Sequence, residues 1–160
     1  GDHRDLHSFP TRRSSDLLAE SGLPPLKVQV SACPAATGPQ ADLAALAVLD
    51  EPRFLHQVVR RDGGGHLARF ADLGTPGALA ALADGEALRC HFHIPLHRPP
   101  QSPLRSTVDE SLAFLARAQQ RGAQHIAVET YTWSALATAP ADREDGVADE
   151  LAWLAQQMFC

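Results

Sequence analysis

The second half of the chain alternates strand and helix patterns, and this alternation most constrains the fold. Apolar and polar side chains alternate along residues 87–95, ALRCHFHIP, which predicts a strand. A helix is predicted over 107–121, where the capping-box sequence TVDE opens it and Gly122 ends it. A further strand over 124–133 and a helix over 144–158 follow. Strand, helix and strand in this order are typical of parallel βαβ units.

The first half of the chain has shorter patterns. A strand is predicted over 26–32, LKVQVSA, followed by a loop over 34–40. Helices are predicted over 41–49, 52–61 and 75–82, and the glycine run after the second one is expected to end that helix. No antiparallel hairpin is expected. The predicted class is therefore α/β, and the three strands correspond to the last βα units of a truncated TIM (β/α)₈ barrel, which needs about 250 residues when complete.

Residues 1–17, GDHRDLHSFPTRRSSDL, resemble the in-frame translation of a short-read sequencing adapter. The stretch Ser8–Asp16 reads back as TCT TTC CCT ACA CGA CGC TCT TCC GAT. A basic targeting arm is the alternative, but three aspartates cancel the three arginines of this segment. We therefore expect 1–17 to be an adapter-derived artefact outside the fold, and 18–160 to be the C-terminal portion of the barrel.

The composition is that of an ordinary globular protein, because 44% of the 160 residues are hydrophobic and 21% are charged. The net charge is -5, and basic residues do not cluster with aromatic ones, so no nucleic-acid partner is predicted. No apolar run approaches the ~18 residues that a membrane span needs. Three cysteines without a CxxC motif fit reduced thiols, which predicts a cytoplasmic protein.

Two histidines stand on one face of the strand predicted over 87–95, near its carboxyl end. His91 and His93 are two residues apart, so their imidazoles share a face. Parallel strands are normally covered by apolar contacts on both faces. The pair therefore predicts metal or substrate binding, or proton transfer, at the edge where α/β folds bind ligands. Hydrogen-bonded core histidines or a solvated strand end are the alternatives.

Glu129 occupies the corresponding place in the next predicted strand. A carboxylate is costly to bury without a partner, and His91 and His93 are the candidate partners. Two imidazoles and one carboxylate form a partial site for Mn²⁺, Zn²⁺ or Fe²⁺. In a catalytic protein, Glu129 and His93 would move the proton. The alternative is a salt bridge between Glu129 and an arginine.

Four further residues are weaker candidates for lining a substrate site. Gln29 and Ser31 end the first predicted strand on one face, although a solvated strand end explains them equally well. His56 lies in the helix predicted over 52–61, where a surface or packing role is the alternative. Tyr131 would form a wall against which a ligand stacks.

Five separated segments, in this order, resemble the C-terminal portion of the EboE family: KVQVSAC, EPRFLHQVV, RFADL, CHFHIPLH and VETYTW. Members of this family are xylose-isomerase-like TIM-barrel proteins linked to metabolite traffic. The resemblance implies a barrel of the sugar-phosphate isomerase and epimerase superfamily, with a divalent metal held by His, Glu and Asp at the strand ends. His91, His93 and Glu129 match the positions that this implies.

The expected function is that of a metal-binding barrel fragment that acts on or carries a small, sugar-like metabolite. If the chain is an enzyme, the expected reaction is a metal-dependent isomerisation or epimerisation. A non-catalytic binding or handover protein is the first alternative, and a truncated fragment without function is the second. Expected partners are the metabolite and proteins of the same trafficking pathway.

Overall fold

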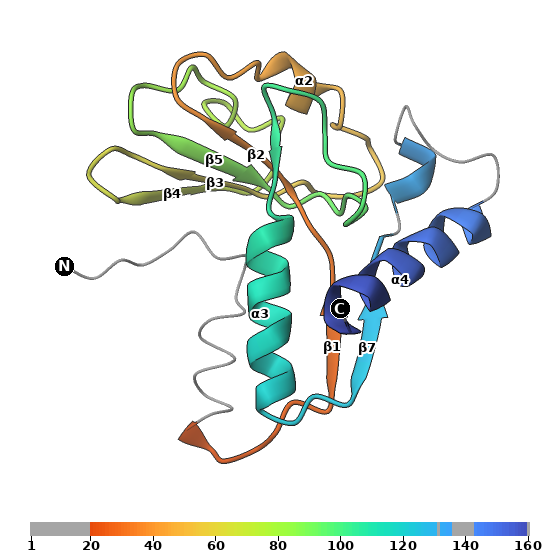
Figure 1. Cartoon of the computed structure of the whole chain (residues 1–160). Helices are drawn as coiled ribbons and strands as arrows, with labels where there is room; N and C mark the ends of the chain where they lie inside the picture. Colours follow the sequence, from red (N-terminus) through yellow and green to blue (C-terminus); the bar gives the residue numbers. More distant parts are fainter. Residues whose placement is uncertain (1–19, 131, 136–142, 160) are drawn as a thin grey trace. The chain divides into compact units, whose positions relative to one another are not determined.

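The computed structural model describes residues 20–130, 132–135 and 143–159, which form two compact units (Figure 1). One unit, here called the sheet unit, comprises Cys33–Phe92 and Pro99–Thr107. The other, here called the helix unit, comprises the remaining described residues. The chain thus leaves the helix unit after Ala32 and returns to it twice.

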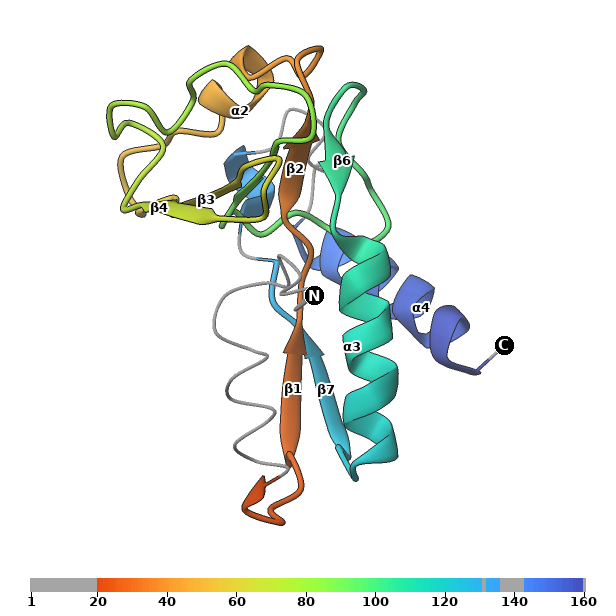
Figure 2. The same cartoon turned by 90° about the vertical axis from the view of Figure 1, so that its left-hand side faces the viewer.

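The sheet unit is built on a five-stranded antiparallel sheet with the strand order β4-β3-β5-β2-β6. Figure 2 shows β6 beside β2 at one edge of this sheet. A short helix, α2 (Ala44–Ala47), lies between β2 and β3 in the sequence. The strands are β2 (Pro34–Thr37), β3 (Val58–Arg61), β4 (Leu67–Phe70), β5 (Ala87–Cys90) and β6 (Arg105–Ser106).

One face of this sheet forms the core of the unit. Val58 lies opposite Cys90, and Ala36 lies opposite Leu88, so these four side chains share a face. All four are fully buried, together with Leu46 of α2. Burial of apolar area contributes roughly 25 cal/mol per Å², so burial of these side chains stabilises the unit.

A tight hairpin joins β3 to β4. The Asp62 carboxylate accepts the backbone N–H of His66 at 2.8 Å, and the Gly65 N–H donates to the Asp62 carbonyl at 3.0 Å. Gly65 has φ +89°, a conformation that glycine adopts without steric cost. The helix predicted over 52–61 is therefore wrong, because the glycine run turns one strand back on another.

The two ends of the sheet unit are joined by hydrogen bonds. The backbone N–H of Cys33 donates to the Thr107 hydroxyl at 2.9 Å, and the Thr107 N–H donates to the Cys33 carbonyl at 3.0 Å. Cys33 directly precedes β2, and Thr107 directly follows β6. The unit consequently begins and ends at one place.

The helix unit contains a pair of parallel strands and two long helices. β1 (Lys27–Val30) pairs with β7 (His125–Val128), with Val28 opposite Ile126. The helix α3 (Val108–Gln120) packs on β1, and the Ser111 hydroxyl donates to the Ser31 carbonyl at 2.7 Å. The 3₁₀ helix η1 (Thr132–Ala135) follows β7, and α4 (Arg143–Phe159) packs on β7.

The prediction of successive TIM-barrel units is wrong. Among the described strands, only β1 and β7 are parallel, and the other five form the antiparallel sheet. The strand expected over 87–95 lies between β3 and β2 as β5, antiparallel to both, and ends at Cys90. The physical reason is that residues 34–37 and 58–61, predicted as a loop and a helix, are the strands β2 and β3 that pair with β5 on either side.

Candidate metal site

His56 is the one fully buried histidine of the described residues, and it precedes β3. Its ring stacks on Phe92, with a centroid separation of 5.0 Å and an interplanar angle of 28°. Its backbone N–H donates to the Asp72 carboxylate at 2.7 Å, and the Leu73 N–H donates to the same oxygen at 2.9 Å. Asp72 thus holds the segment that carries His56 in place.

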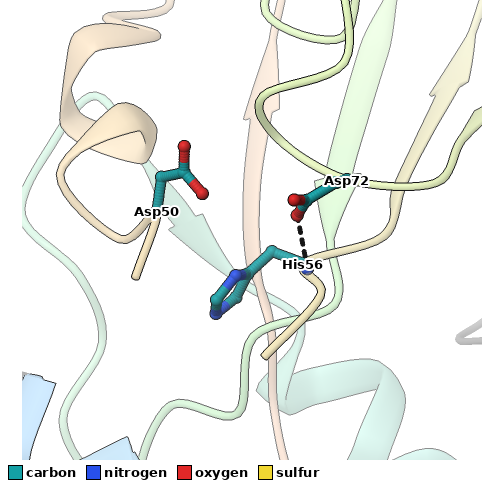
Figure 3. Close-up of side chains that lie close together, drawn as sticks. All are labelled: Asp50, His56 and Asp72. Atoms are coloured by element: carbon teal, nitrogen blue, oxygen red, sulfur yellow. Dashed lines mark hydrogen bonds between the residues drawn. The ribbon is translucent and has the colours of Figure 1, made fainter. Parts of the chain in front are cut away.

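Two carboxylates approach the His56 imidazole from separate loops (Figure 3). Asp50 follows α2, and Asp72 follows β4. One ligand atom from each of Asp50, His56 and Asp72 lies within 4.8 Å of the others. Since metal–ligand bonds of nitrogen and oxygen are about 2.0–2.2 Å, two ligands of one ion lie up to about 4.4 Å apart. Side-chain shifts of a few tenths of an ångström would let one ion contact all three.

Neither ring nitrogen of His56 has a hydrogen-bond partner, although the side chain is completely buried. Leaving a buried polar group unsatisfied costs about 1–3 kcal/mol, so native proteins contain few such groups. Asp50 is exposed and Asp72 is half-buried, so the site has access to solvent on the Asp50 side. A cation between them would satisfy the imidazole and offset both negative charges.

The Cys90 thiol is buried and feels the negative charge of the same carboxylates. Burial raises the pKa of Cys90 well above its usual range, and the charges of Cys33, Asp72 and Asp50 raise it further. A thiol in this environment keeps its proton at neutral pH, whereas the thiolate is the form that binds metals. The ligand atoms that lie within 4.8 Å of one another come from Asp50, His56 and Asp72 and not from Cys90, so the ligand set consists of one nitrogen and carboxylate oxygens.

The histidines predicted from the 87–95 strand belong to different units. His91 is exposed in the sheet unit, beyond the end of β5, and its N–H donates to the Gln57 carbonyl at 2.7 Å. His93 lies in the helix unit, where its Nδ1 is 2.6 Å from the backbone carbonyl of Glu129.

The group at metal-binding distances within the described part of the chain is Asp50, His56 and Asp72, and it includes neither His91, His93 nor Glu129. His93 contacts the Glu129 main chain through its Nδ1, at the backbone carbonyl. The assignment of His91, His93 and Glu129 as metal ligands, and of Glu129 and His93 as catalytic groups, stays a prediction.

The weaker candidates also divide between the units. Gln29 is exposed on β1, and Ser31, half-buried directly after β1, accepts the Ser111 hydroxyl through its carbonyl. Both belong to the helix unit, whereas His56 belongs to the sheet unit. Tyr131 lies outside the described residues.

Sequence reasoning missed Asp50 and Asp72, although a signal for Asp72 exists. In the β3–β4 hairpin Val58 lies opposite Phe70, and extending this register by two residues places His56 opposite Asp72. Reading the Asp-Gly-Gly-Gly segment as a hairpin turn would have paired these residues. No comparable local pattern marks Asp50.

Comparison of the chain with protein-family models, curated proteins and solved structures found no match. The resemblance to the EboE family therefore stays a prediction. None of the helices in the described ranges is both long enough and apolar enough to cross a membrane.

Proposed function

We propose that this chain binds a divalent metal ion through Asp50, His56 and Asp72. The observation that carries this proposal is the His56 imidazole, which is fully buried with both nitrogens unpartnered and has a ligand atom within 4.8 Å of an oxygen of each of two carboxylates. A buried group of this kind loses hydration without compensation unless a ligand replaces the water.

The ligand set narrows the choice of metal. One imidazole and two carboxylates suit Zn²⁺, Mn²⁺ or Fe²⁺ better than Ca²⁺, which takes oxygen ligands almost exclusively, or Cu⁺, which prefers sulfur. Three protein ligands leave at least one coordination position for water or substrate, as in catalytic metal sites. The exposure of Asp50 gives a small molecule a route to that position.

The chemistry that such a site supports is polarisation of a carbonyl or hydroxyl oxygen, or activation of a bound water. The resemblance to the EboE family suggests that the substrate is a small sugar-like metabolite. It also suggests that the activity is that of a metal-dependent isomerase or epimerase. Metabolite binding without turnover is the alternative function. In both cases metal binding at Asp50, His56 and Asp72 is the first requirement.

The test is calorimetric titration of the metal-stripped full chain with Zn²⁺ and Mn²⁺. We expect one ion per chain, and we expect Asp72→Asn to weaken binding by more than about tenfold, the loss that even outer-sphere partners cause. Asn keeps an oxygen that can accept the His56 and Leu73 N–H groups, so this variant removes the charge while preserving the local fold.

A second aspartate–histidine pair in the same unit provides the control. Asp62 and His66 form an exposed ion pair at 3.1 Å in the β3–β4 turn. We expect Asp62→Asn to leave the metal affinity unchanged. Equal affinity of the native protein, Asp72→Asn and His56→Ala would contradict the proposal.

A further inference from the structure

Three arginines form a row across the five-stranded sheet. The register places Arg69 opposite Val59, Val59 opposite Arg89, Arg89 opposite Ala35, and Ala35 opposite Arg105. Residues directly opposite one another in antiparallel strands point to the same face. Arg69, Arg89 and Arg105 therefore project from one face, on β4, β5 and β6.

A fourth arginine belongs to the same face. Arg61 lies two residues after Val59 on β3, and side chains two apart on a strand share a face. The four residues Arg61, Arg69, Arg89 and Arg105 are here called the arginine face. The other strand positions on this face are Ala35, Thr37, Val59, Leu67 and Ala87. None of these side chains is acidic or aromatic.

The arginine face is the side of the sheet opposite the core. Val58, Leu88 and Cys90 on the other side are fully buried. Arg69 and Arg105 are exposed, and Arg61 and Arg89 are half-buried. The side chains of the row are thus on the outer side of the sheet.

Arg60 shows what a structural arginine looks like in the same unit. It projects to the core side, where its guanidinium donates to the carbonyls of Gly77, Ala80 and Ala81 and to the Glu86 carboxylate, all at 3.0–3.1 Å. Its role is to hold the loop between β4 and β5. The exposed Arg69 and Arg105 have a different environment, on a face whose strand positions supply only positive charge.

The spacing of the row indicates an extended ligand. Neighbouring strands lie about 4.8 Å apart, so arginines on every second strand are about 10 Å apart and the row spans about 19 Å. A single phosphate or carboxylate group is too small to bridge these positions. A duplex nucleic acid carries one charge per about 1.7 Å of its axis and presents many phosphates over this length.

The residues between the arginines exclude base recognition by stacking. Proteins that bind single strands use aromatic side chains as stacking platforms, and the strand positions of this face hold none. Guanidinium groups bind phosphates in a bidentate manner without reading sequence. We propose that the arginine face binds the phosphate backbone of a nucleic-acid duplex.

The sequence predicts no nucleic-acid partner, because the net charge is -5 and basic residues do not cluster with aromatic ones along the chain. The antiparallel register, in contrast, gathers residues 61, 69, 89 and 105 on one surface. This inference is independent of the proposed metal site, because the arginine face and the metal ligands use different residues.

The test is fluorescence anisotropy of a labelled 20-base-pair duplex titrated with the full chain at low salt. We expect binding that does not depend on base sequence. The logarithm of the affinity should fall against the logarithm of the salt concentration with a slope of about -2.7 for the three phosphates that Arg61, Arg69 and Arg105 would neutralise, since Arg89 already has a partner within the chain. Arg69→Gln and Arg105→Gln should each reduce this slope by about 0.9, and the double variant should bind more than about tenfold more weakly.

Arg117→Gln is the matched control, because Arg117 is an exposed arginine of α3 whose guanidinium donates to the Ala113 carbonyl of its own helix. We expect this variant to keep the native affinity and slope. Circular dichroism confirms that the sheet variants are folded. Native affinity in the folded Arg69→Gln/Arg105→Gln variant, or no binding to the duplex by the native chain, would overturn the proposal. Tighter binding to single-stranded DNA, or displacement by an equal charge concentration of polyglutamate, would also overturn it.

Discussion

His56 in the sheet unit and Glu150 in the helix unit are both completely buried ionisable residues, but their surroundings differ. Glu150 lies on α4, and its Oε1 accepts the Leu96 N–H at 2.8 Å and the Thr130 hydroxyl at 2.9 Å. Burial raises the pKa of Glu150, and these two hydrogen bonds oppose the rise. Both ring nitrogens of His56, in contrast, are unpartnered.

The comparison separates a structural role from a binding role. Glu150 ties together two loop segments, and a proton on its otherwise unpartnered Oε2 can neutralise its charge. The His56 ring stacks on Phe92 but forms no hydrogen bond, because both of its nitrogens lack a partner. Burial alone therefore does not indicate function, whereas burial without partners beside two carboxylates does.

The largest expected effect is a loss of stability when the buried Glu150 is replaced by an apolar residue. Glu150→Leu leaves the Leu96 N–H and the Thr130 hydroxyl without an acceptor, and we expect it to lower the free energy of unfolding by about 2–4 kcal/mol. Trp133 and Trp153 both lie in the helix unit, so tryptophan fluorescence during urea denaturation measures this change.

The matched substitution in the sheet unit is His56→Phe. It removes two unsatisfied polar atoms and preserves the stacking on Phe92, so we expect the metal-free protein to be as stable as the native one or about 1 kcal/mol more stable. Thermal denaturation followed by circular dichroism measures this. A loss as large as that of Glu150→Leu would show that the contrast between the two groups is wrong.

The second effect is stabilisation by metal. At a free Zn²⁺ concentration 100 times the dissociation constant, we expect about 2.7 kcal/mol of added stability for the sheet unit. Amide hydrogen exchange of His56 and Leu73, whose N–H groups bond to Asp72, should slow accordingly. EDTA should reverse the effect, and Asp72→Asn, which weakens binding by more than about tenfold, should lose at least about half of it at the same Zn²⁺ concentration. Equal slowing in Asp72→Asn would place the ion elsewhere.

The smallest expected effect is a dependence of the helix unit on pH. Because the folded-state pKa of Glu150 is raised above its ordinary value of 4.5, the folded protein binds the proton more tightly than the unfolded chain. The contribution of Glu150 to the free energy of unfolding is therefore greatest below pH 4.5. It falls as the pH rises through the folded-state pKa, by at most about 1.4 kcal/mol per pH unit.

Glu150→Gln removes this titration while keeping an oxygen acceptor for Leu96 and Thr130. Urea denaturation of both proteins between pH 4 and 8, followed by tryptophan fluorescence, isolates the contribution of Glu150. We expect the free energy of unfolding of Glu150→Gln to rise relative to that of the native protein as the pH increases. A difference that stays constant across this range would contradict the assigned direction of the shift.

Local patterns predicted the long helices well. The helices expected over 107–121 and 144–158 are α3 and α4 with nearly the same ends, because apolar periodicity, an opening cap and Gly122 all act within a few residues. Gly122 has φ +95°, as a helix-ending glycine often does. The central residues of β1, β5 and β7 were also predicted as strands.

The antiparallel sheet and the candidate site depend on long-range pairing, which local patterns do not encode. A helix is predicted over 52–61 because helical spacing separates Phe54, Leu55, Val58 and Val59. Only the pairing of β3 with β4 and β5 shows that Val58–Arg61 is a strand. A glycine run ends a helix or turns a hairpin equally well. The pairing of His56 with Asp72 follows from the hairpin, but the approach of Asp50 requires the folded loop after α2.

The joined ends of the sheet unit have a consequence for the chain as it leaves the ribosome. β1 is complete at Val30, but its partner β7 begins at His125, about 95 residues later. At about 5–20 residues per second, β1 waits roughly 5–20 seconds for that partner. Meanwhile the intervening sheet unit can close through Cys33 and Thr107 and bring the growing end back beside β1. During this interval Val28 and Val30, which are buried in the folded protein, have no partner strand.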